Sequence, residues 1–170
     1  MKKFKNIYNF IIGGVLLSLS FPPFPFFPLA FISFIFILNG IENELKIEKQ
    51  RFFIKFYLTF FIYHICSNWW ISSFQENTDP FLMMAGFSLD IFHPIFFMIP
   101  MYAYLKIRKV FSKKISILIF PILWVGWEYF HSIGELSYPW LAVGNTQINN
   151  IYLVQIADVC GVWGVSFVVL

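Results

Sequence analysis

Charged residues are scarce in this sequence of 170 residues: Asp, Glu, Lys and Arg make up 12%, against about 25% in ordinary soluble domains. Hydrophobic residues reach 59% and aromatic residues 22%. This composition excludes a soluble globular protein. It also excludes a disordered chain, which needs low hydrophobicity and high net charge. An integral membrane protein remains, with room for about five to seven helices of about 20 apolar residues each.

Cysteine and the common catalytic motifs are also rare or missing. The two cysteines, Cys66 and Cys160, lie in separate apolar runs and predict no disulfide. The sequence has no glycine-rich phosphate loop, no Gly-x-Ser-x-Gly motif and no Cys/His spacing typical of zinc. We therefore expect neither a metal nor a cofactor.

Basic residues are confined to three clusters. The twelve are Lys2, Lys3 and Lys5; Lys46, Lys49, Arg51 and Lys55; Lys106, Arg108, Lys109, Lys113 and Lys114. The alternate loops, 21–28, 75–80 and 131–150, contain none. The positive-inside rule places all three clusters, and the amino terminus, in the cytoplasm. The net charge of +3 is therefore an orientation signal and gives no support for nucleic-acid binding.

The stretches between these clusters predict an all-α membrane protein, a polytopic helical bundle of about six transmembrane segments. The expected segments are 7–20, 29–41, 52–74, 81–105, 115–133 and 151–170. The fourth segment contains Pro94 and Pro100, which predict a kink at a protein-facing surface.

The first two segments share one charge-free stretch, residues 6–41, which as a single helix would be about 54 Å long. The prolines between 22 and 28 break it. The result is either two short spans or a re-entrant hairpin. A cleavable signal peptide ending near Ser18-Leu19-Ser20 is the alternative for the amino terminus.

Four ionisable residues lie within the apolar segments: Asp90, His93, Glu128 and Asp158. Such residues suggest function by default, although many merely pair inside a bundle. Asp90 and Glu128 each precede a histidine by three residues, as in di-metal helical bundles. The two pairs differ in depth by about 10–15 Å, which argues against a shared metal. One alternative function is a small, non-enzymatic transporter or lipid-binding protein with a midplane path of Asp90, His93 and Asp158, although no inverted repeat is visible.

Two aromatic groups, Trp69-Trp70 and Tyr138-Pro139-Trp140, are expected at the extracytoplasmic interface. An aromatic belt at headgroup depth would account for them. However, hydrogen-bonding residues accompany both groups, including Asn68 in the first case and Gly144-Asn145-Thr146-Gln147 in the second. That combination suits a pocket for a lipid headgroup or an acylated peptide.

Several motifs, taken in order, resemble the membrane domain of bacterial apolipoprotein N-acyltransferases over essentially the whole chain. They are Leu19-Ser20-Phe21-Pro22-Pro23-Phe24 with Pro28-Leu29-Ala30; Ser67-Asn68-Trp69-Trp70-Ile71-Ser72-Ser73; Pro121-Ile122-Leu123-Trp124 with Glu128-Tyr129-Phe130; Tyr138-Pro139-Trp140-Leu141 with Gly144 and Gln147; and Gly161-Val162-Trp163-Gly164-Val165-Ser166-Phe167. Where the family commonly has Glu-x-x-Arg-Gly, this chain has Glu128-Tyr-Phe-His131-Ser132. Any ion-pair role of that arginine is thereby weakened or passed to His131.

The resemblance implies a multi-pass protein of the bacterial inner membrane. It would take part in lipoprotein maturation, in which an acyl chain passes from a phospholipid donor to the amino-terminal diacylglyceryl-cysteine of an apolipoprotein. The resemblance also suggests a substrate-binding role for Trp69, Trp70, Glu128, Pro139, Trp140 and Gln147. The family's catalytic Cys, Glu and Lys belong to an extracytoplasmic nitrilase-like domain that these residues do not supply. We therefore expect no catalytic residue here, and a truncated chain that is inactive alone.

Overall fold

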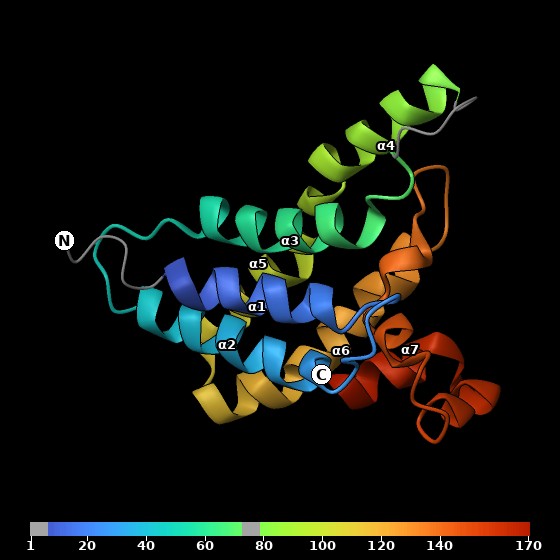
Figure 1. The fold of residues 1–170 in the computed structure, drawn as a ribbon. Helices are drawn as coiled ribbons and strands as arrows, with labels where there is room; N and C mark the ends of the chain where they lie inside the picture. Colours follow the sequence, from blue (N-terminus) through green and yellow to red (C-terminus); the bar gives the residue numbers. More distant parts are fainter. Residues whose placement is uncertain (1–6, 73–78) are drawn as a thin grey trace. The chain divides into compact units, whose positions relative to one another are not determined.

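The computed structural model describes residues 7–72 and 79–170 (Figure 1). Every regular element within these ranges is helical, which confirms the expected helical class. The α-helices are α1 (Ile7–Leu19), α2 (Leu29–Glu44), α3 (Phe52–Asn68), α4 (Pro80–Phe92), α5 (Pro94–Val110), α6 (Lys113–His131) and α7 (Ala157–Val169). Three short 3-10 helices precede α7: η2 (Pro139–Leu141), η3 (Val143–Gln147) and η4 (Val154–Ile156).

The chain divides into two compact units, and each is described by itself. The first comprises Met1–Ser18 and Ile32–Met98, and the second comprises Leu19–Phe31 and Ile99–Leu170. The prolines of the α1–α2 connection therefore fall in the second unit. The predicted helix break at these prolines is confirmed, because residues 20–28 form turns.

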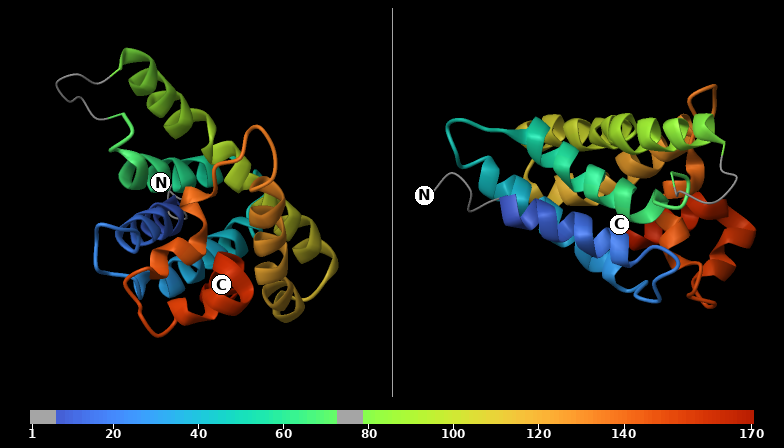
Figure 2. Two further views of the ribbon diagram at one scale, coloured as in Figure 1. Left: turned by 90° about the vertical axis from the view of Figure 1, so that its right-hand side faces the viewer. Right: turned by 45° about the horizontal axis from the view of Figure 1, so that its top comes forward.

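In the first unit, α1, α2 and α3 lie side by side (Figures 1 and 2). A Cβ atom on Gly14 would lie 2.6 Å from the Thr59 carbonyl oxygen, so only glycine permits this close approach of α1 to α3. The Thr59 hydroxyl lies 3.1 Å from the Phe10 carbonyl oxygen, to which it donates. Small residues and hydrogen bonds between helices are the usual means of helix association inside a membrane.

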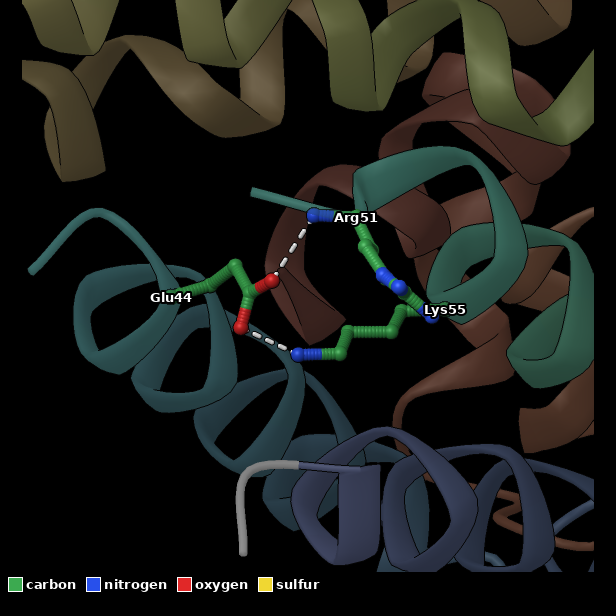
Figure 3. A network of polar contacts seen from close by, with 3 residues as sticks. All are labelled: Glu44, Arg51 and Lys55. Atoms are coloured by element: carbon green, nitrogen blue, oxygen red, sulfur yellow. Dashed lines mark hydrogen bonds and ion pairs between the residues drawn. The ribbon is translucent and has the colours of Figure 1, made fainter. Parts of the chain in front are cut away.

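A buried ion pair joins the end of α2 to α3. Lys55 Nζ contacts Glu44 Oε2, and the Arg51 backbone N–H donates to Glu44 Oε1 at 2.8 Å (Figure 3). Lys55 Nζ also lies 5.7 Å from the centre of the Phe10 ring. Both charged side chains are almost fully buried, so each charge depends on the other.

A buried histidine pair joins α3 to the α4–α5 junction. His64 Nε2 lies 2.7 Å from His93 Nδ1, and His64 Nδ1 lies 2.7 Å from the Phe60 carbonyl oxygen. Because that carbonyl can only accept, His64 carries its hydrogen on Nδ1. His93 Nδ1 then donates to His64 Nε2. The structure thus places His93, which is buried, at a junction between helices.

The second unit contains most of α5, together with α6, the 3-10 helices and α7. The Tyr104 and Phe120 rings meet edge to face at 5.4 Å, and Trp124 lies next to Phe120 at 5.8 Å. Helix α7 packs against η3 and α6. Gly161 interrupts α7 with φ of +64°, a conformation that glycine adopts without strain.

The helix bounds refine the expected segments. The third helix ends at Asn68 rather than at residue 74, since Trp69–Ser72 form a turn in which Ser72 Oγ donates to the Trp69 carbonyl oxygen. The last segment begins as turns and η4, so its α-helix starts only at Ala157. Lys2, Lys3, Lys5 and most of the expected turn at 75–80 lie outside the described residues.

Within the described ranges, one helical stretch is long and apolar enough to cross a membrane, judged only by its length and composition. It is Pro80–Val110, which comprises α4 and α5. α4 and α5 are separated by a single turn residue, His93, just before Pro94, and the His93 backbone keeps right-handed helical dihedrals with φ of −64° and ψ of −29°. α5 continues through Pro100. Ile7–Leu19 and Val154–Val169 are apolar but shorter. Six crossings stay a prediction.

Candidate functional site

Glu128 organises the site in the second unit. One turn separates Trp124 from Glu128 on α6, and Trp124 Nε1 donates to Glu128 Oε1 at 2.8 Å. The backbone N–H of Val143, at the start of η3, donates to the same oxygen at 2.8 Å. Glu128 is 7% exposed. This carboxylate therefore fastens the segment after η2 to the end of α6.

The second oxygen of Glu128, Oε2, is buried and has no hydrogen-bond partner among the described residues. Ser166 Oγ, on α7, accepts from the Gly144 backbone N–H at 2.8 Å and so ties η3 to α7. No lysine or arginine pairs with Glu128 in the part of the chain that the structure describes. A buried carboxylate is thus held by neutral donors from α6 and η3.

Gly144 and Gln147 fix the rest of η3. A Cβ atom on Gly144 would collide with the Val162 carbonyl oxygen of α7, so a side chain here would force the two segments apart. Gln147 is fully buried, and its Nε2 donates to the Phe27 carbonyl oxygen at 3.0 Å. This bond ties η3 to the proline-rich connection between α1 and α2.

Pro139 and Trp140 are held by Asn145. Its Nδ2 group donates to the Trp140 carbonyl oxygen at 2.8 Å and to the Pro139 carbonyl oxygen at 3.2 Å. The Trp140 side chain nevertheless remains 62% exposed. The backbone that carries this indole is therefore fixed while its apolar ring stays available for contact. We name residues 139–147 the η2–η3 loop.

The structure brings four of the six predicted binding residues into this unit: Glu128, Pro139, Trp140 and Gln147. Glu128 and Gln147 are buried supports, whereas Pro139 and Trp140 are exposed. Trp69 and Trp70 lie in the first unit, at the end of α3, and are also exposed. Their proximity to Trp140 stays a prediction.

The residues of the alternative polar path are distributed differently. Asp90 and His93 are buried in the first unit, where Asp90 faces the side chain of Asn68. Asp158 belongs to the second unit and is exposed in the first turn of α7. The described residues contain no group of three His, Cys, Asp or Glu side chains placed to hold a metal ion.

Sequence reasoning missed two parts of this arrangement. Ser166 was noticed only within a motif, because nothing in its spacing indicates that it meets Gly144 across 22 residues. The Glu44–Lys55 pair was not predicted, because both residues lie in or beside a charged connector and looked like ordinary exposed charges. The one available signal was a lysine three residues inside an otherwise apolar helix.

Known proteins resemble this chain in sequence. An apolipoprotein N-acyltransferase of Chlorobaculum tepidum is 31% identical over 161 residues, which cover 92% of this chain and 28% of that protein. One from Geobacter metallireducens is 32% identical over 162 residues, which cover 94% of this chain and 30% of that protein. No solved structure matches the chain.

The sequence profile described as "Apolipoprotein N-acyltransferase N-terminal domain" matches residues 13–170, nearly the whole chain. This match includes all of the η2–η3 loop and every residue that holds it. The chain therefore belongs to the apolipoprotein N-acyltransferase family, and it corresponds to the N-terminal domain of that family.

Proposed function

We propose that this chain is the membrane part of an enzyme system that N-acylates apolipoproteins. The acyl donor is a phospholipid, and the acceptor is the amino-terminal S-diacylglyceryl-cysteine of the lipoprotein. The names of the relatives support acyl transfer to apolipoproteins. The chain spans about 30% of the length of these relatives, so their complete activity is a proposal for it.

The proposed setting is the bacterial inner membrane, crossed about six times with the amino terminus in the cytoplasm. The separation of all twelve basic residues into three clusters supports this orientation. The many exposed apolar side chains of α4, such as Phe81, Met84 and Phe92, are consistent with contact to lipid. The η2–η3 loop then lies at the extracytoplasmic face.

The proposed role of the η2–η3 loop is to hold acyl chains. The observation that carries this proposal is the contrast within the loop: Asn145 fixes the backbone of Pro139 and Trp140, while the Trp140 ring is exposed. A fixed backbone lowers the entropy lost when an aromatic side chain binds an apolar ligand. Trp69 and Trp70 are proposed to line the same lipid slot.

We place the covalent chemistry outside these 170 residues, in a nitrilase-like domain. Acyl transfer through a thioester needs a thiolate, a base and oxyanion donors. Cys66 and Cys160 are exposed thiols on α3 and α7 and do not match the family's nucleophile. The described residues thus bind substrates in this proposal but do not react with them.

The experiment uses the purified chain in phosphatidylethanolamine vesicles with a diacylated lipopeptide that carries a photoactivatable acyl chain. We expect crosslinks within the η2–η3 loop and a severalfold loss with Trp140→Ala. Tyr152→Ala is the matched control, because Tyr152 is an exposed aromatic residue of the same unit outside the loop. Equal crosslinking by both variants would contradict the binding role.

The same sample tests where the chemistry lies. Mass spectrometry of the lipopeptide should show no added acyl chain after incubation with this chain and phospholipid alone. A third acyl chain added with turnover would contradict the placement of the chemistry outside these residues. Cys66→Ser and Cys160→Ser would then identify which thiol had reacted.

A further inference from the structure

The connection between α5 and α6 carries five basic residues with no acidic residue among them. They are Lys106, Arg108, Lys109, Lys113 and Lys114. The four lysines are exposed. The sequence contains no Asp or Glu from residue 91 to residue 127. We name residues 106–114 the α5–α6 tip. It contains the five basic residues and the two-residue link between the helices, Phe111 and Ser112.

The connection between α2 and α3 has a similar number of basic residues but is internally compensated. Three acidic residues, Glu42, Glu44 and Glu48, are interspersed there with Lys46, Lys49 and Arg51. Glu44 also pairs with Lys55 and accepts from the Arg51 backbone N–H (Figure 3). The positive-inside rule accounts for basic residues in both connections, but it does not account for the absence of acidic residues from the sequence of one of them.

None of the four lysines of the α5–α6 tip forms an ion pair within the described residues. The acids of that unit are Glu128, Glu135 and Asp158. Glu128 is buried 14 residues beyond Lys114 on the same helix, a separation of about 21 Å. That distance is well beyond the screening length of about 8 Å at physiological salt.

Two apolar side chains project from the middle of this basic surface. Val110 is 77% exposed and Phe111 is 47% exposed. Arg108 Nη1 donates to the Phe111 carbonyl oxygen at 3.3 Å, which fixes the turn that presents them. Apolar side chains flanked by lysines are typical of surfaces that enter the headgroup region of a bilayer. A soluble polyanion would match the lysines but not these two residues.

We propose that the α5–α6 tip binds the headgroups of anionic phospholipids, with Val110 and Phe111 inserted among the lipids. The site lies at the cytoplasmic face and is separate from the η2–η3 loop. The inference rests on the membrane orientation in the proposed function, but not on acyl transfer. Failure of lipopeptide crosslinking would leave it standing.

A site-specific quenching experiment tests this proposal. A bimane fluorophore is attached at Val110→Cys in a chain that also carries Cys66→Ser and Cys160→Ser. The labelled chain is placed in phosphatidylcholine nanodiscs that contain a small fraction of headgroup-proximal doxyl lipid. We expect doxyl-phosphatidylglycerol to quench the fluorophore more strongly than doxyl-phosphatidylcholine, with a preference that falls as salt is raised.

Two triple variants remove three positive charges each. Lys109→Gln/Lys113→Gln/Lys114→Gln should abolish the preference for phosphatidylglycerol, with a loss of apparent affinity of about fivefold for each lysine removed. Lys46→Gln/Lys49→Gln/Arg51→Gln, in the compensated connection, should retain most of it. Lys109→Arg/Lys113→Arg/Lys114→Arg keeps the charge and should retain the preference.

Three results would overturn the proposal. Equal quenching by the two doxyl lipids would show that the tip has no preference for phosphatidylglycerol. An equal loss in both glutamine triple variants would show that only the net charge of the chain matters. Competition by soluble heparin that matches competition by phosphatidylglycerol vesicles would show that the tip selects any polyanion. Unchanged tryptophan fluorescence would confirm that the variants are folded.

Discussion

Two buried glutamates, one in each unit, connect a helix end to a later segment by different chemistry. Glu44, the last residue of α2, pairs with the Lys55 ammonium group and also accepts a backbone N–H. Glu128, in the last turn of α6, is held by the neutral donors of Trp124 and Val143. The charge of Glu44 therefore depends on a cation, whereas Glu128 is needed for the oxygen that accepts hydrogen bonds from its neighbours.

The difference indicates what each glutamate contributes. An ion pair depends on both of its charges, because either one left alone is buried without compensation. Hydrogen bonds from neutral groups fix direction and position, and a neutral acceptor of the same shape can replace the carboxylate. The first arrangement suits helices that must stay together. The second suits a loop whose backbone must be positioned to receive a ligand.

The largest effect is expected from Lys55→Met. This change leaves the Glu44 carboxylate buried without its cation, at a cost of about 3–5 kcal/mol in the free energy of unfolding. Detergent-titrated unfolding, followed by tryptophan fluorescence, measures it. The double variant Glu44→Gln/Lys55→Met should recover most of the loss, and a double variant as unstable as Lys55→Met alone would contradict the dependence on charge.

A smaller loss, about 2–3 kcal/mol, is expected from Glu128→Ala. The change leaves two buried donors, Trp124 Nε1 and the Val143 N–H, without their acceptor. Limited proteolysis should show new cleavage near the η2–η3 loop and none near α3. Unchanged resistance of the loop would mean that Glu128 does not hold it.

Ser166→Ala is expected to cost about 1 kcal/mol, because it removes the acceptor of the buried Gly144 N–H. The same unfolding assay measures it. Val165→Ala offers a control on the same helix: it alters buried apolar packing but should leave proteolysis of the loop unchanged. If Ser166→Ala also leaves proteolysis of the loop unchanged, the contact from α7 is unimportant.

Local features of this fold were predictable from the sequence, and long-range pairings were not. The prolines between Pro22 and Pro28 predicted the break between α1 and α2, since proline removes backbone donors wherever it occurs. Pro94 coincides in the same way with the interruption between α4 and α5 at His93. The bond from Val143 on η3 to Glu128 and the bond from Gly144 to Ser166 on α7 are set by tertiary packing, which spacing along one helix does not reveal.

The most direct test of the account is hydrogen exchange at the Val143 amide in the intact chain, compared among the wild type, Glu128→Gln and Glu128→Ala. Glutamine keeps an acceptor oxygen for the Val143 N–H and for Trp124 Nε1. The account predicts slow exchange in the wild type and in Glu128→Gln, and exchange about 30-fold faster in Glu128→Ala, for a local loss of about 2 kcal/mol. Equal exchange rates in all three, or fast exchange in Glu128→Gln, would contradict the claim that Glu128 holds the η2–η3 loop as a hydrogen-bond acceptor.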